Sequence, residues 1–147
     1  MAGFKLIGQP IVEATFSAPI SSLTVSKGDL LALGAGATTW SLGAATTEHW
    51  QLKAVALADA ITADTEVLAI LVSSVAQEWE AESANNSNAA HNGDRMLLTD
   101  EDTVNNTGTD STAEEACFIQ TGVIGAAADK RIKGIIVPGT GVNPDAA

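Results

Sequence analysis

The sequence predicts an all-β protein: a small β-barrel or β-sandwich domain with an extended N-terminal arm. Apolar runs of strand length recur along the chain between turn-forming residues, and none has the spacing of a convincing amphipathic helix. The length of 147 residues suffices for one domain with its own hydrophobic core. We divide the chain into an arm at residues 1–22, a β-domain at residues 23–137 and a tail at residues 138–147, which is flexible by composition.

The predicted arm is apolar and almost uncharged. Lys5 and Glu13 are its only charged residues, and Pro10 and Pro19 interrupt it. An apolar segment with so little charge is a liability in water, so we expect it to lie on its own domain or on a neighbouring subunit. An ordinary first strand beside a loose terminus is the alternative.

The β-domain is predicted to begin with a hairpin. Residues 23–26 alternate apolar and polar side chains, residues 27–29 (Lys-Gly-Asp) supply a turn, and residues 30–33 form the return strand. A glycine-punctuated loop carrying Trp40 follows. Residues 48–58 alternate again and have one wholly apolar face, which indicates another strand.

Residues 67–82 carry the clearest strand signal. Residues 67–72 are almost all large and apolar, which is typical of a strand covered on both faces. Residues 77–82 alternate strictly, with Trp79 on one face and three glutamates on the other. We interpret Trp79 as a core or interface anchor.

The three glutamates of this strand are Glu78, Glu80 and Glu82. Strand geometry separates their carboxylates by about 7 Å, a spacing that paired-carboxylate chemistry could use. Because the sequence offers them no acid/base partner, we interpret them as an outward-facing acidic edge that discourages sheet-to-sheet aggregation.

The second half of the β-domain is predicted to end in a hairpin. Residues 84–92 form an asparagine- and alanine-rich loop, and residues 96–98 a short strand. Residues 99–115 are polar and acidic and are predicted to be a loop, with at most a helical turn near residues 112–116. Residues 117–124 and 132–137 are the two strands of the final hairpin.

Charge and cysteine content argue against several classes of partner and against an internal disulfide. Eighteen acidic against seven basic residues give a formal net charge of −11. This charge repels phosphate backbones and anionic lipids, so we expect neither nucleic-acid nor membrane partners. The single cysteine, Cys117, cannot form an internal disulfide and is interpreted as a small buried hydrophobe. We predict no secretory signal and no transmembrane helix.

Motifs for catalysis and cofactor binding are weak, and we expect neither an enzyme nor a cofactor. Residues 34–36 (Gly-Ala-Gly) lack the further glycine and the lysine of phosphate-binding loops. The two histidines, His49 and His91, form no metal-binding motif, and no Gly-x-Ser-x-Gly elbow is present.

One acidic stretch could supply oxygen ligands to a hard cation such as calcium. The candidates are Asp100, Glu101, Asp102, Asn105, Asn106 and Asp110. Their spacing departs from an EF-hand loop, because Val104 falls where a ligand is expected and the sixth-position glycine is missing. We therefore assign no metal site and interpret the stretch as a solvated acidic loop, with loose calcium binding as the alternative.

The segment from Gln77 to Val137 resembles the capsid decoration (cement) proteins of tailed bacteriophages. The matching elements are QEWEAE, an Asn/Ala loop, GDRMLLTD, the VNNTGTDST loop and CFIQTGVIGAAADKRIKGIIV, in this order. The resemblance extends from about Leu30 to Val137 and is strongest in the last 60 residues of that range. Its motifs are structural, and the N-terminal arm has no counterpart in it.

The resemblance implies a compact β-domain that binds the outside of a capsid, often as a trimer, and clamps neighbouring major capsid subunits. It implies the major capsid protein and the chain itself, as a homotrimer, as partners. It also implies a virion location after synthesis in the host cytoplasm. The residues expected at capsid or subunit interfaces are Phe4, Leu6, Ile7, Ile11, Phe16 and Trp79.

Two other hypotheses remain open on the sequence. A carbohydrate-binding module or host adhesin would present exposed tryptophans. Another head or tail-fibre component of a virion is the third possibility, and an enzyme ranks below all of these.

Overall fold

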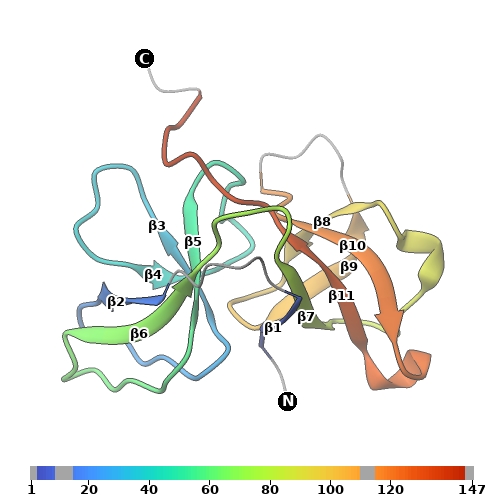
Figure 1. Cartoon of the computed structure of the whole chain (residues 1–147), viewed down its shortest axis with the longest axis horizontal. Coiled ribbons are helices and arrows are strands. Elements are labelled where there is room, and N and C mark those ends of the chain that lie inside the picture. Colours follow the sequence, from blue (N-terminus) through green and yellow to red (C-terminus); the bar gives the residue numbers. More distant parts are fainter. Residues whose placement is uncertain (1–2, 9–14, 110–114, 145–147) are drawn as a thin grey trace.

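The computed structural model describes residues 3–8, 15–109 and 115–144, and it confirms an all-β fold. The strands of this part are β1 Lys5–Gly8, β2 Thr15–Pro19, β3 Leu30–Leu33, β4 Ser41–Leu42, β5 Leu52–Ala56, β6 Glu66–Leu71, β7 Glu78–Ser83, β8 Arg95–Leu98, β9 Thr103–Thr109, β10 Phe118–Ile124 and β11 Arg131–Ile136. They form two lobes side by side, with β2 to β6 in one and β1 and β7 to β11 in the other (Figure 1). No helix of the described residues is long and apolar enough to cross a membrane.

One lobe, the barrel lobe, is a closed five-stranded barrel. Its sheet runs β1-β7-β11-β10-β8-β9, and a parallel pairing of β9 with β7 closes the ring at Glu82↔Thr103 and Ser83↔Val104. Strand β1 lies outside the ring and pairs with β7. The barrel interior takes alternate side chains from each strand, such as Trp79 and Ala81 of β7.

The other lobe, the sheet lobe, is an antiparallel sheet in the order β2-β6-β5-β3-β4. It curls so that its two terminal strands meet at one point, where the backbone N–H of Trp40 donates to the carbonyl of Pro19 at 2.8 Å. The sheet closes around small side chains, including Ala18, Ala54 and Ala69. Alanine therefore fills this core, as the composition suggested.

The predicted N-terminal arm is extended but divided between the lobes. Strand β1 joins the barrel lobe and β2 joins the sheet lobe. The backbone N–H of Gly3 donates to the Asp102 carbonyl at 2.9 Å, which ties the beginning of the described chain to the barrel lobe. The described parts of the predicted arm are thus incorporated into the two sheets as strands, which is closest to the alternative of an ordinary first strand.

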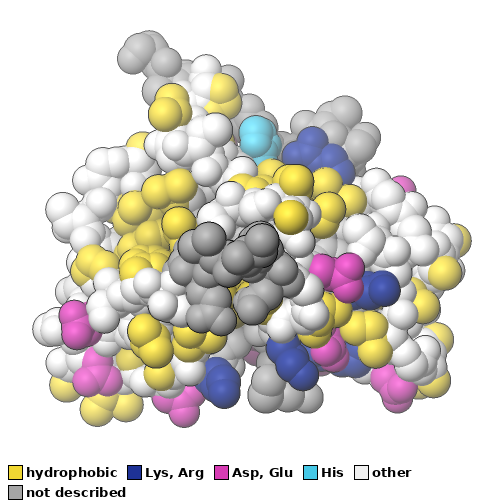
Figure 2. All heavy atoms as spheres, in the orientation of Figure 1, with side chains coloured by type: hydrophobic (Ala, Val, Ile, Leu, Met, Phe, Trp, Pro, Cys, Tyr) yellow, Lys and Arg dark blue, Asp and Glu magenta, His cyan; other side chains and the backbone are white. Residues whose placement is uncertain are grey.

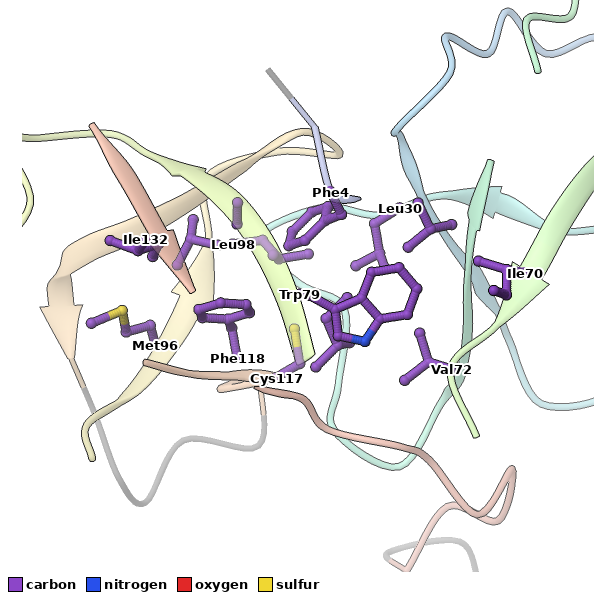
Figure 3. Packing of buried hydrophobic residues seen from close by; sticks show 14 residues of the cluster. Phe4, Leu30, Ile70, Val72, Trp79, Met96, Leu98, Cys117, Phe118 and Ile132 are labelled. Atoms are coloured by element: carbon purple, nitrogen blue, oxygen red, sulfur yellow. The ribbon is translucent and has the colours of Figure 1, made fainter. Parts of the chain in front are cut away.

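A shared hydrophobic core joins the lobes. Leu30, Val55 and Ile70 reach it from the sheet lobe, and Phe4 and Trp79 reach it from the barrel lobe (Figure 3). The Trp79 indole lies between Phe118 on one side and Ile70 and Val72 on the other, and it has no exposed surface. Burying one large apolar side chain is worth about 1.5–3 kcal/mol, so this joint holds the lobes together strongly.

The predicted hairpin over residues 23–33 is wrong, although its turn is present. Gly28 has a φ of 96°, and the Asp29 carboxylate accepts the Ser26 N–H at 2.8 Å. However, Val25 forms only an isolated bridge with Ala60, and β3 pairs with β4 and β5 instead. The turn at residues 27–29 was therefore predicted correctly, but contacts with strands distant in the sequence determine which strands pair.

The predicted loop over residues 99–115 is also wrong, because it contains β9. Polar residues such as Asn106 have low strand propensity, but pairing with β7 and β8 on both sides overrides it. The buried Asn106 amide donates to the carbonyls of Asn85 and Asn86 and accepts the Asn85 N–H. Residues 110–114, which include part of the predicted helical turn, lie outside the described residues.

Two predictions for residues 67–82 have different outcomes. The alternation in β7 is confirmed, because Trp79, Ala81 and Ser83 are buried. Strand β6 is not covered on both faces throughout, since Leu68 is 48% exposed. The final hairpin is confirmed as β10 paired with β11.

The beginning of the predicted tail packs on the sheet lobe. Gly141 donates its backbone N–H to the Trp50 carbonyl at 2.9 Å. Gly139 lies so close to the chain that a Cβ there would overlap the Gln51 carbonyl oxygen. The segment after β11 therefore crosses from the barrel lobe to the sheet lobe in contact with both.

Candidate functional site

The residues predicted to contact a partner fall into two groups. Phe4 and Trp79 are 3% and 0% exposed, so their side chains serve the chain's own core and not a surface contact. Ile7 is 41% exposed, and Leu6 and Phe16 are half-buried. Ile11 lies outside the described residues.

The accessible residues of the predicted set lie on an edge strand of each sheet. Ile7 and Leu6 are on β1, the edge strand of the barrel-lobe sheet. Phe16 is on β2, which lies at one end of the sheet-lobe strand order. Its ring packs on Trp40 with a centroid distance of 5.4 Å. Leu6 packs against the core that the two lobes share, whereas Phe16 packs against the core of the sheet lobe.

A groove lies at the joint between the lobes and is called the interlobe groove here. It encloses about 410 Å³ and is lined by Phe4, Lys5, Leu6, Thr15, Lys27, Gly28, Val55, Ala56, Leu57, Ile70 and Trp79. Its lining comes from β1 and β7 of the barrel lobe and from β2, β5 and β6 of the sheet lobe, together with the turn at residues 27–28. Sequence reasoning could not find it, because it exists only through the docking of two lobes.

The rim of the interlobe groove carries two lysines with carboxylates nearby, since Lys5 lies opposite Glu80 on β7 and Lys27 lies beside Asp59. Lys5 and Lys27 are both exposed, and neither takes part in the ion pairs of the described residues. The neighbouring carboxylate of Asp59 accepts the backbone N–H of Lys27 at 2.8 Å. In Figure 2, basic and acidic side chains both lie below the boundary between the lobes on this face. A molecule with net charge −11 thus places two of its seven bases beside an apolar groove.

The buried Trp79 indole has a polar group left over. Its Nε1–H has no hydrogen-bond partner among the described residues. A buried unpaired donor costs about 1–3 kcal/mol. The residue is therefore held at the joint by its apolar contacts with both lobes and not by hydrogen bonding.

The three glutamates of β7 do not form an acidic edge, which corrects the prediction. Strand β7 is an interior strand with β1 and β11 on either side. Glu80 accepts a 2.9 Å hydrogen bond from Nε of Arg131, and Glu78 lies 4.0 Å from Nζ of Lys133. The pattern is a charge ladder across neighbouring strands, which stabilises their register.

The acidic stretch that could have held calcium is only partly described by the structure. Among the described residues, no group of three or more His, Cys, Asp or Glu side chains is placed to hold a metal ion. Asn105 accepts hydrogen bonds from the backbone N–H and the hydroxyl of Thr107, and the Asn106 amide is engaged as described above. Asp110 lies outside the described residues.

The same stretch instead forms an acidic cluster against the turn at residues 26–29. Burial, followed by a hydrogen bond with Asp100, raises the pKa of Asp102 to about 6. Burial also raises the pKa of Asp29, and the charges of Glu101, Asp100 and Asp59 add to the effect. This cluster is electrostatically costly at neutral pH.

Lys53 is a buried group that sequence reasoning missed. Its side chain on β5 is 0% exposed, and its ammonium donates to the carbonyls of His49, Gln51 and Val137 at 2.8, 2.9 and 2.8 Å. Burial lowers the pKa of Lys53 to about 8. The available signal was a single lysine inside the apolar run LKAVALA.

Cys117 lies in the same region and is unreactive by environment. It is fully buried, and burial raises the pKa of its thiol to about 11. A thiol with a raised pKa is rarely the thiolate that reacts. The interpretation of Cys117 as a small buried hydrophobe is confirmed.

Comparison with known proteins gives no relative at any level. No family model, no curated protein and no solved structure matches the chain.

Proposed function

We propose that this chain is a non-enzymatic capsid decoration protein that binds the outside of a bacteriophage capsid and stabilises neighbouring major capsid subunits. One observation carries the proposal. The elements that resemble decoration proteins, from QEWEAE to the last strand, make up β7, β8, β9, β10 and β11, the strands of a single closed barrel. The strongest part of the resemblance therefore falls within one structural unit, and its weaker part, from about Leu30, extends into the sheet lobe.

The physical properties of the molecule suit that role. The lobes share one core, so force applied to one lobe is transmitted to the other through packed side chains. The net charge of −11 favours solubility of a particle that carries many copies. Many copies on one shell also make weak individual contacts effective through multivalency.

The test is binding to capsids assembled from the major capsid protein encoded in the same genome. Purified wild-type chain is added, unbound chain is removed by sedimentation, and the occupied sites are located by cryo-electron microscopy. We expect saturable binding on the outer surface and a higher temperature of shell rupture. Capsids that sediment without the chain at any concentration would remove the proposal.

A carbohydrate-binding role receives no support from the tryptophans. Trp40, Trp50 and Trp79 are all buried, at 7%, 8% and 0% exposure, so none presents a ring face for sugar stacking. We therefore expect no change of tryptophan fluorescence on adding glycans. A saturable change would favour the binding-module hypothesis.

A further inference from the structure

We propose that Asn92 is a deamidation site, which the folded chain holds inactive through Gln120. Asn92 and Gly93 form the only Asn-Gly pair of the sequence. In such a pair the glycine nitrogen reaches the asparagine side chain most easily, because the following residue has no Cβ to obstruct it. The pair is exposed in the turn between the short helix η1 (Ala89–His91) and β8, on the side of the barrel lobe away from the sheet lobe (Figure 1). This chemistry does not depend on what the chain binds.

The reaction needs only water and the chain itself. The backbone nitrogen of Gly93 gives its proton to solvent base and bonds to Cγ of Asn92. The bond from Cγ to the side-chain nitrogen then breaks, and that nitrogen takes a proton from solvent and leaves as ammonia. Water opens the resulting five-membered succinimide at either carbonyl. The products are aspartate and isoaspartate, and in isoaspartate the main chain runs through the side-chain carbons.

The attacking nitrogen is engaged in the folded chain. The N–H of Gly93 donates to the main-chain carbonyl of Gln120 at 2.8 Å, and this bond has to break before the nitrogen can react. The ring closes only when the Asn92 side chain and the Gly93 nitrogen lie on the same side of the Cα–C bond. The observed ψ of 128° at Asn92 holds them apart.

The attacked side chain is engaged by the same residue. Nε2 of Gln120 donates to Oδ1 of Asn92 and to the carbonyl of Asn88, both at 2.9 Å. The Asn88 carbonyl can only accept, so it fixes which end of the Gln120 amide faces the turn. Gln120 is fully buried, and its Oε1 has no partner among the described residues, which makes its two donated bonds the favourable contribution of this amide. Gln120 therefore holds the nucleophile with its main chain and the electrophile with its side chain.

Deamidation at this turn would loosen the barrel lobe. Isoaspartate lengthens the main chain at position 92, so the Gly93 N–H and the Gln120 carbonyl no longer meet in register. Their contact adjoins the pairing of β8 with β10, which spans only two residue pairs. Either product also adds a negative charge two residues before Asp94. Because the reaction is irreversible, each opening of the turn that leads to ring closure changes the chain permanently.

The first experiment compares folded and unfolded wild type. Full-length chain is incubated at pH 8 with and without urea, and the deamidated fraction of each asparagine is measured by peptide mass spectrometry. A synthetic peptide of residues 89–96, measured in both solutions, corrects for the effect of urea on the chemistry. In urea we expect Asn92 to react faster than every other asparagine. In the folded chain we expect its rate to be at least about tenfold lower, because two hydrogen bonds have to break before the ring closes.

Two results of this comparison overturn the proposal. One is an equal rate at Asn92 in the folded and the unfolded chain. The other is an unfolded chain in which a different asparagine reacts faster.

The second experiment tests Gln120 in the folded chain. Gln120→Met removes the side-chain donor and keeps a similar length. Gln77→Met is the matched control, because Gln77 is 1% exposed and its amide also holds a loop, with all its side-chain hydrogen bonds within residues 71–77. Thermal melts establish that both variants are folded during the incubation. We expect Gln120→Met to deamidate at Asn92 about three- to tenfold faster than wild type, for the loss of one hydrogen bond. The control should stay within about twofold of wild type.

The remaining outcomes count against Gln120. A rate in Gln120→Met that matches wild type, or an equal acceleration by the control, assigns the protection to overall folding and overturns the proposal. If Gln120→Met does not fold, hydrogen exchange at the Gly93 amide of wild type decides. We expect this amide to be protected, and exchange at the rate of an unfolded chain overturns the proposal.

Discussion

Replacing Lys53 by methionine tests the energetics of the joint between the lobes. The ammonium of Lys53 donates to three backbone carbonyls, two from the segment before β5 and one from Val137, the residue after β11. Methionine has a similar shape and no donor, so all three carbonyls lose their partner. Each unpaired buried acceptor costs about 1–3 kcal/mol.

An opposing effect comes from removing a buried charge. Burial lowers the pKa of Lys53 from 10.5 to about 8, and each pKa unit corresponds to about 1.36 kcal/mol, so charge burial costs roughly 3 kcal/mol. Methionine recovers that cost. The loss of three hydrogen bonds exceeds it, and we expect Lys53→Met to lower the free energy of unfolding by roughly 2–3 kcal/mol at pH 7.

The pH dependence of wild type separates the two effects. Between pH 8 and 10.5 the unfolded chain keeps a proton on Lys53 that the folded chain has lost, so stability rises with pH in that window. Cys117 acts in the opposite direction from pH 9 to 11, because its folded pKa is raised from 9.0 to about 11. The clean window is therefore about pH 7.5 to 9.

The assay is urea unfolding followed by circular dichroism across that window. We expect wild type to gain up to about 1 kcal/mol as pH rises from about 8 to 9, and Lys53→Met to show no such gain. The exposed Lys27→Met variant is the matched control and should behave like wild type. A variant as stable as wild type at pH 7, or a wild type whose stability stays flat to pH 9, would refute the reasoning about the buried ammonium.

Three further predictions concern other buried groups. Asp102→Asn should stabilise the fold at pH 7 by roughly 1 kcal/mol. Wild type should become more stable as pH falls from about 6 towards 4, because the pKa of Asp102 is raised in the folded chain and its carboxylate is costly above about pH 6. The Asp102→Asn variant should lack most of this gain. Denaturant unfolding at pH 4, 5, 6 and 7 measures the stability at pH 7 and its pH dependence. Gly134→Ala should unfold the barrel lobe or cost about 3 kcal/mol or more, since the new Cβ would overlap the Ile119 carbonyl oxygen, and a normal melt would contradict the register in which β10 pairs with β11. Asn106→Ala should lower the free energy of unfolding by about 2 kcal/mol or more, because the carbonyls of Asn85 and Asn86 lose a buried donor; Thr107→Ala, on the exposed neighbour, is its control.

Elements with strong local signals could be predicted from the sequence. The alternation of residues 77–82 predicted β7 and the burial of Trp79, because a period of two depends only on which face of one strand is covered. The final hairpin was predicted because β10 and β11 are neighbours in sequence as well as in space. Both elements could be predicted because neither prediction required knowledge of a strand that is distant in the sequence.

The elements that failed depend on distant partners. Strand β9 is polar and becomes a strand because β7 and β8 supply hydrogen bonds on both sides. Residues 23–26 look like a hairpin strand, yet β3 finds its partners at β4 and β5. The interlobe groove could not be predicted from the sequence for the same reason. Its lining residues lie between positions 4 and 79, and only the docking of the lobes brings them together.

The position of Trp79 connects the fold with the proposed role. It lies near the start of the segment on which the proposed role rests, and its ring fills the joint between the lobes. A protein that clamps neighbouring subunits must resist bending between the surfaces that hold each of them. A large, rigid side chain packed against both lobes opposes that bending, because a close-packed core transmits strain instead of absorbing it.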